Sequence, residues 1–192
     1  MSKRKNLPMR LIIILLIALA CGSTALYVQY SIAATQGTLG VSSQGDATLS
    51  MDIPQLVRIS GIQDINFGNF SGGADLSQDV DVCVYTNLDG GEYRVRASGS
   101  GVDNAFDLER DGTGQEVPYV VYWSDTIGTA GDQIALLTGQ ASVVQDGANT
   151  ASQNCGGGAS ANFEVRMTAN NLLNVPAGQY SGVLTLTILP ES

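Results

Sequence analysis

The chain has 192 residues, a formal charge of −9 and no histidine. This length suits one domain with its own core, and the acidic excess argues against nucleic acid or anionic membrane as a partner. Without a histidine, a Gly-x-Ser-x-Gly motif or a lysine beyond Lys5, the chain lacks the usual bases and nucleophiles, so we predict that it is not an enzyme.

Residues 1–34 have the layout of an export signal. The positive residues are Lys3, Arg4, Lys5 and Arg10. An apolar run over Leu11–Ala20 follows, and small residues before Gln36 allow cleavage near Ala33 and Ala34, so we predict a signal peptide. Two alternatives stay open: a longer, uncleaved membrane anchor, and a lipoprotein signal at Cys21. Without the signal, 158 residues carry five basic and 18 acidic groups, a formal charge of −13.

Residues 35–54 form an N-terminal extension with the pattern of a β-strand. Its apolar positions are Ala47, Leu49, Met51 and Ile53, separated by Thr48, Ser50 and Asp52. A period of two is typical of a strand with one face to bury, and Pro54 ends it. The pattern alone leaves open whether this is an ordinary first strand of the domain or a separable arm that exchanges with another copy. An earlier pair, Leu39 and Val41, is a weaker candidate for such an arm.

Residues 55–192 are predicted to form one β-sandwich. Short strands are expected over 79–84, 93–97, 117–123, 134–137 and 162–168, with turns rich in Gly, Asn and Asp and no amphipathic helix. Residues 87–91 (Asn-Leu-Asp-Gly-Gly) indicate a hairpin between the first two of these strands. This pattern predicts an antiparallel β-sandwich of immunoglobulin-like type. A last strand is expected close to the end of the chain, at Tyr180, Leu184, Leu186 and Ile188.

Cys83 and Cys155 are the only cysteines after the predicted signal. Export to an oxidising compartment favours a disulfide between them. It would close a 73-residue loop, which the chain-entropy model values at roughly 4 kcal/mol. A reactive thiol is the rival interpretation, but no histidine is available to activate one.

Two further patterns allow a binding function. Residues 107–116 place acids at the first, third and fifth positions and glycine at the sixth, as in a calcium loop, but Pro118 stands at the twelfth position. We therefore interpret the segment as a glycine-rich turn and expect no metal. Trp123, with Tyr119 and Tyr122, could form a sugar-stacking surface, although aromatic residues in an apolar strand usually belong to the core.

Four segments occur in an order that resembles a known family. They are Ile65-Asn66-Phe67-Gly68, Val82-Cys83-Val84-Tyr85-Thr86, residues 117–125 (VPYVVYWSD) and residues 176–187 (PAGQYSGVLTLT). This arrangement resembles pilin subunits of the spore coat protein U type, which include the archaic (Csu-like) chaperone-usher pilins; alpha-fimbrial pilins are the next closest class. Relatives often have a cysteine soon after the N-terminal arm, whereas residues 57–60 contain none.

The resemblance implies an incomplete sandwich, which a donor strand from elsewhere completes. Ala47, Leu49, Met51 and Ile53 would be the donor residues, and the strand at Tyr180, Leu184, Leu186 and Ile188 would line the acceptor groove. The implied partners are a periplasmic chaperone, an outer-membrane usher and neighbouring copies, in a surface fimbrium that serves adhesion or biofilm formation, with no cofactor. The alternative is a monomeric secreted binding module, such as a tip adhesin or a carbohydrate-binding domain.

Overall fold

The computed structural model describes residues 34–129 and 132–191. The predicted signal therefore lies outside the described residues, apart from Ala34. The chain divides into two units between Asp52 and Ile53. No described helix is both long and apolar enough to cross a membrane.

The described part of the first unit contains a short hairpin and an extended segment. The N–H groups of Thr35 and Asp46 each donate to the other residue's carbonyl, at 2.9 Å. A side chain at Gly45 would place its Cβ 2.9 Å from the Thr35 carbonyl oxygen, so glycine permits this close approach. Residues 47–52 belong to no strand, and Leu49 and Met51 are 92% and 83% exposed. Within the described residues this segment thus forms no strand ladder.

The second unit is built around a five-stranded antiparallel sheet. In spatial order its strands are β1 (Val57–Ser60), β2 (Leu76–Thr86), β8 (Ala161–Met167), β6 (Val120–Ser124) and β7 (Ile134–Ala135). In β8, Phe163 and Val165 face the core while Arg166 is exposed, because successive side chains of a strand point to opposite faces. The alternation predicted over 162–168 is thus confirmed.

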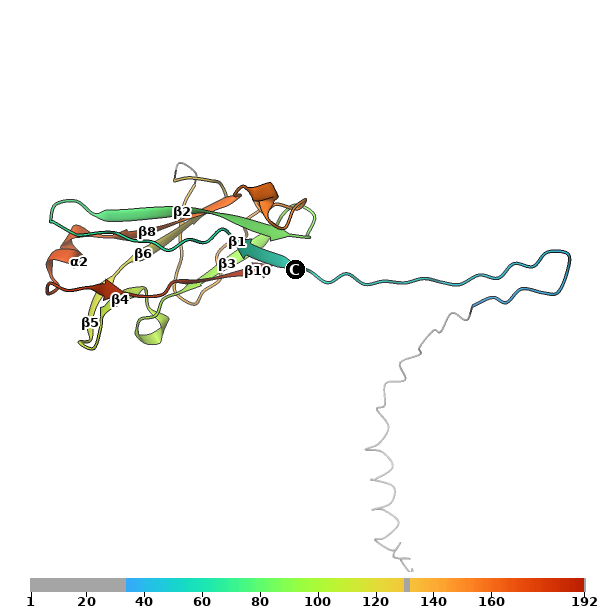
Figure 1. The fold of residues 1–192 in the computed structure, drawn as a ribbon, viewed down its shortest axis with the longest axis horizontal. Coiled ribbons are helices and arrows are strands. Elements are labelled where there is room, and N and C mark those ends of the chain that lie inside the picture. The colour runs from blue at the N-terminus through green and yellow to red at the C-terminus, as the bar shows by residue number, and fades with distance from the viewer. Residues whose placement is uncertain (1–33, 130–131, 192) are drawn as a thin grey trace, which may run out of the picture. The chain divides into compact units, whose positions relative to one another are not determined.

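A second layer packs against this sheet (Figure 1). It contains β3 (Tyr93–Ser98) paired with β10 (Thr185–Pro190), and β4 (Asp107–Arg110) paired with both β5 (Gln115–Pro118) and β9 (Tyr180–Ser181). The other edge of β3 is covered by loop 138–145, where Ser142 N–H donates to the Val95 carbonyl at 2.8 Å. Three short helical turns lie in loops: η1 (Val102–Asn104), η2 (Cys155–Gly157) and α2 (Ala169–Leu173). The sequence pattern did not predict α2, whose N-cap is Thr168.

The centre of the core is aromatic. Trp123 and Tyr93 are fully buried, with their rings edge to face and centroids 6.3 Å apart. The Trp123 indole N–H donates to the Tyr93 hydroxyl at 3.2 Å, so the polar end of each ring is satisfied. Tyr119 is also buried, whereas Tyr122 lies on the outer face, under the Arg166 guanidinium at 4.5 Å. The core interpretation of Trp123 is confirmed, and a sugar-stacking role for it is wrong.

The predicted hairpin at residues 87–91 is wrong, although the turn is present. β2 belongs to the five-stranded sheet and β3 to the second layer, so the turn connects two sheets. Gly90 and Gly91 have φ values of 91° and 74°, and a Cβ at Gly91 would lie 2.8 Å from the Ala148 carbonyl oxygen. The glycines therefore serve a crossing between layers, which local sequence cannot distinguish from a hairpin.

The segment around residues 107–123 also differs in part from expectation. Residues 107–118 form the hairpin β4–β5, with Gly112 and Gly114 at positive φ in its turn; the glycine-rich turn is confirmed. The single strand expected over 117–123 is wrong, because the chain forms two strands, β5 and β6, on either side of Tyr119. There the Tyr119 N–H donates to the Phe106 carbonyl at 2.8 Å, in the register of the β4–β5 ladder, whereas Val120 already pairs with Arg166 of β8.

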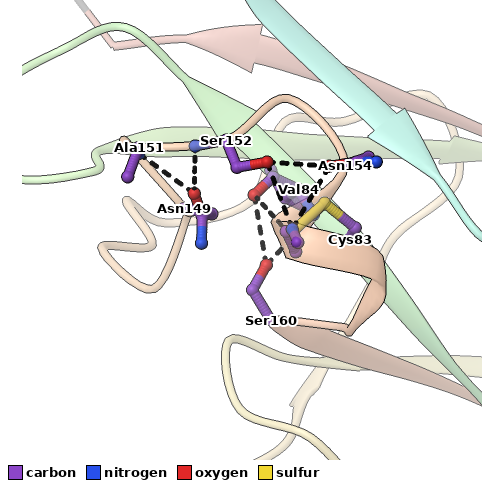
Figure 2. The surroundings of a disulfide bond; sticks show 9 residues. Cys83, Val84, Asn149, Ala151, Ser152, Asn154 and Ser160 are labelled. Atoms are coloured by element: carbon purple, nitrogen blue, oxygen red, sulfur yellow. Dashed lines mark hydrogen bonds between the residues drawn. A yellow bond between two sulfur atoms is a disulfide. The ribbon is translucent and has the colours of Figure 1, made fainter.

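The disulfide between Cys83 and Cys155 is present, as predicted. It links β2 to the loop that precedes β8, and Figure 2 shows how densely this loop is hydrogen-bonded. The Asn149 side chain accepts from the N–H groups of Ala151 and Ser152 at 3.0 and 2.6 Å. Ser160 Oγ donates to the Val84 carbonyl at 3.1 Å. The bridge therefore holds an irregular 149–160 loop against the edge of the core.

Glu164 is a buried charge on the outer face of the five-stranded sheet, with its side chain only 5% exposed. The Arg166 guanidinium and the Gln133 amide donate to its carboxylate, at 2.6 to 2.8 Å. The Arg166 hydrogen bond is the main cause that holds the pKa of Glu164 below its usual value. Because the pKa of Glu164 is lower in the folded than in the unfolded state, its ionised carboxylate stabilises the fold at pH values above the unfolded-state pKa. This contribution is lost as the pH falls through the folded-state pKa.

Glu164→Gln is therefore expected to lower the free energy of unfolding at pH 7 by about 1 to 2 kcal/mol, because charged hydrogen bonds to a partly exposed arginine are lost. The difference from wild type should shrink as the pH falls through the lowered folded-state pKa of Glu164, where the wild-type carboxyl becomes protonated. Urea unfolding at pH 7 and at pH 3 measures this, with the exposed Glu109→Gln as the matched control. A loss that is equal at both pH values would contradict the assignment.

Candidate functional site

The second unit has an open seam between two strand edges. β1 is the edge strand of the five-stranded sheet, and β10 is the edge strand of its own pair. β1 and β10 lie side by side, but they form no ladder with each other. Beyond β1, residues 61–70 belong to no strand. An unpaired edge leaves backbone N–H and C=O groups available to a further strand.

Where this seam continues past β1, an apolar groove of about 340 Å³ lies between residues 62–67 and residues 182–186. Its floor includes Phe163 and Val165 of β8, which belong to the hydrophobic core, so the groove opens directly onto the core. Two polar residues, Gln63 and Asp64, lie in its wall. The remaining lining residues are Ile62, Ile65, Phe67, Leu108, Tyr119, Gly182, Val183, Leu184 and Leu186. An apolar opening onto a core is suited to receive apolar side chains from outside.

The predicted C-terminal strand forms one wall of the groove, but it is interrupted. Tyr180 lies in β9 and Ile188 in β10, and residues 182–184 belong to neither strand. At the interruption Ser100 Oγ accepts the Val183 N–H at 2.8 Å. A Cβ at Gly182 would lie 2.9 Å from the Asp107 carbonyl oxygen, so glycine lets the chain pass close to β4.

The four residues predicted for this strand have different positions. Leu184 and Leu186 line the groove. Ile188 is 7% exposed and belongs to the core cluster, beneath the seam rather than in the opening. The Tyr180 hydroxyl donates to the Pro176 carbonyl at 2.8 Å and so fixes the turn before β9.

The candidate donor residues lie in the segment before β1. Leu49, Met51 and Ile53 expose 92%, 83% and 65% of their surface, which is high for large apolar side chains. At roughly 3.3 Å per residue, an extended segment over 47–53 spans about 23 Å. The wall residues that line the groove, 182–186, cover a shorter stretch, so the segment is long enough to fill it. The segment and the groove also match in polarity.

A second hollow lies beside the groove and is polar. It has a volume of about 460 Å³ and is lined by Ser100, Glu109, Asp111, Gln179, Ser181 and Gly182. Two carboxylates at an open surface do not by themselves make a metal site. Nowhere in residues 34–129 and 132–191 do three or more Asp, Glu, Cys or His side chains gather around a possible ion. The apolar groove is the stronger candidate because it reaches the core.

Much of the groove wall was not predicted from the sequence. Ile62 and Val183 carried no signal, because each lies in or beside a segment without regular pairing. Leu108 lies in the short strand β4, in a segment that the sequence pattern had indicated only as a turn. Ile65 and Phe67 belong to a motif that the family resemblance had already singled out. Their spacing of two was the only local sign that this segment lies along a sheet edge.

No protein-family model and no curated protein sequence matches this chain. Among solved structures, it is similar to a chain from a chaperone–tip adhesin complex of CFA/I fimbriae. The TM-score is 0.50 and the identity 20%, and the match covers 71% of this chain and 42% of that one.

A weaker likeness is to the P pilus rod subunit PapA, with a TM-score of 0.38 and 20% identity, over 77% of this chain and 100% of that one. Another is to the CupB6 tip adhesin from Pseudomonas aeruginosa, with a TM-score of 0.27 and 12% identity, over 81% of this chain and 43% of that one. The chain thus spans less than half the length of the CFA/I chain that it matches. The CFA/I likeness shows the fold, and the predicted all-β, immunoglobulin-like sandwich of the pilin type is confirmed.

Proposed function

We propose that this protein is a structural subunit of a cell-surface pilus, in which residues 47–53 of one copy fill the groove of the next. The observation that supports this most directly is the apolar groove between residues 62–67, which follow β1, and residues 182–186, open to the core at Phe163 and Val165. A donor strand would supply both the missing backbone partners and the missing side chains.

The energy available from such an insertion is large for a single strand. Ala47, Leu49, Met51 and Ile53 alternate, so all four can face the groove while Thr48, Ser50 and Asp52 face outward. At roughly 1.5 to 3 kcal/mol for each large apolar side chain, burial contributes on the order of 5 to 9 kcal/mol. Backbone hydrogen bonds along the strand add to this.

A neighbouring copy is a better donor than the chain's own arm. If the chain folded back on itself at Pro54–Leu56, Ile53 would lie opposite Val57. Each residue one position before Ile53 would then face the residue one position after Val57. Leu49 and Met51 would then face residues 59–61, where β1 and β10 lie side by side, and Ala47 alone would reach the opening at 62–67. Head-to-tail insertion between copies avoids this mismatch and produces an open filament.

The same proposal includes the assembly route. An empty groove exposes core residues, so the subunit needs a temporary strand in transit, which a periplasmic chaperone and an outer-membrane usher would provide and exchange. We therefore assign residues 1–34 to export, 35–54 to the donor extension and 55–192 to the acceptor domain. The resemblance to spore coat protein U and archaic pilins favours that subfamily, with a role in adhesion or biofilm formation.

The test is an SDS gel of the fraction sheared from cells that produce the protein, with and without boiling. We expect a ladder of multimers that collapses to monomer on boiling, because strand exchange is non-covalent but separates slowly. A single monomer band in both lanes would overturn the proposal and favour a self-contained binding domain.

A further inference from the structure

Most hydrogen bonds that hold the stretch before β1 to the body come from Asn87, which directly follows β2. Asn87 Oδ1 accepts the Leu56 N–H at 2.7 Å, and Asn87 Nδ2 donates to the Pro54 carbonyl at 2.9 Å. The Asn87 N–H donates to the Leu56 carbonyl at 3.1 Å. Gln55 Nε2 reaches the Glu191 carbonyl at 3.4 Å, so the same stretch also touches the end of β10. We call residues 54–56 with Asn87 the clamp.

The clamp leaves no free chain between the donor segment and the body. Ile53 is the last donor residue, and the next carbonyl, that of Pro54, is already bound by Asn87. The proline ring also fixes φ at this position. If Ile53 sits in a neighbour's groove, the two bodies are joined through one peptide bond and a proline, without the flexible residues that a linker needs to bend.

We propose that Asn87 is a positioning residue that makes the junction between successive subunits stiff. This inference rests on the proposed strand exchange and adds a property that strand exchange alone does not give. The partner is a second copy of this chain. The rim of its groove would lie against the end of the sandwich formed by the clamp, the turn after β2 and the end of β10. Figure 1 shows the C-terminal end of the chain beside β1 and β10 at this place.

Asn87→Ala tests this in the full chain. Asn174→Ala is the matched control, because it also removes an exposed amide, whose 2.8 Å bond to the Asn170 carbonyl stays within one local turn. Three readouts are needed: the heat-sensitive ladder, hydrogen exchange of the Leu56 amide in the monomer, and the persistence length of fibres in negative-stain micrographs.

We expect Asn87→Ala to keep the ladder, to speed Leu56 exchange and to shorten the persistence length roughly twofold or more, as a joint gains flexible residues; Asn174→Ala should resemble wild type. Faster Leu56 exchange with an unchanged persistence length overturns the inference. If Asn87→Ala does not fold, Asn87→Asp replaces it as the test variant, because it keeps the acceptor for the Leu56 N–H and loses the donor to the Pro54 carbonyl. An unchanged persistence length in Asn87→Asp would overturn the inference in the same way. Absence of a ladder in the wild type would instead reject the strand exchange itself.

Discussion

Met51→Asp is expected to abolish the heat-sensitive multimers and to leave a folded monomer. Met51 is 83% exposed and outside the core, so the variant should unfold in urea as the wild-type monomer does. In the assembled fibre the same side chain would lie in an apolar groove, where an unpaired carboxylate costs several kcal/mol. That cost is comparable with the 5 to 9 kcal/mol that burial of the arm contributes. The SDS gel without boiling measures the loss.

Ser50→Asp is the control for this variant. It adds the same charge one residue away, on the opposite face of the strand, which points out of the groove. It should therefore leave the ladder intact. Equal loss in both variants would mean that added negative charge, rather than insertion of Met51, prevents assembly.

Mixing Met51→Asp subunits with wild-type subunits tests the direction of strand insertion. The Met51→Asp subunit has a damaged arm and an intact groove, so it can accept a wild-type arm but cannot donate its own. In mixtures it should end growing fibres and shift the ladder toward short multimers as its fraction rises. A symmetric interface would instead give mixed dimers without a shift in length, since both partners then use the same patch.

The strands with a buried face were predictable from local pattern. In β8 the alternation of Phe163, Val165 and Met167 with Glu164 and Arg166 follows directly from a sheet with one face on the core. The disulfide followed from two cysteines in an exported chain. The proposed donor segment could be recognised for the same reason as β8, since its apolar residues alternate with polar ones, although the partner that we propose for it lies in another copy.

The groove itself could not be predicted in this way. Its wall over 61–70 forms no ladder, and the spacing of two between Ile65 and Phe67 is too short a pattern to predict a strand. The opposite wall changes partner at residues 182–184, where Ser100 and the close approach of Gly182 to β4 replace regular pairing. The β2–β3 turn illustrates the same limit, because Gly90 and Gly91 fit a hairpin as well as a crossing between sheets.

Loss of the disulfide should have the second large effect. Replacing Cys83 and Cys155 together with alanine removes a bridge with a sequence separation of 72. We expect the free energy of unfolding of the monomer to fall by about 4 kcal/mol, from the greater entropy of the unfolded chain. Urea unfolding measures this best in the Met51→Asp background, where assembly cannot mask the change. A loss below about 1 kcal/mol would mean that the hydrogen-bonded 149–160 loop holds without its bridge.

The same double variant should behave differently inside a fibre. A single domain is stable by only about 5 to 15 kcal/mol, and an open groove places this subunit toward the low end. A loss of about 4 kcal/mol then leaves the isolated monomer close to unfolding. A bound donor strand stabilises the folded state by linkage, and its 5 to 9 kcal/mol exceeds the loss. Subunits without the disulfide that reach the fibre should therefore remain folded, whereas free subunits should be degraded. A comparison of the half-lives of the double variant in fibres and as free subunits measures how far the stability of the fold depends on the donor strand of a neighbouring subunit.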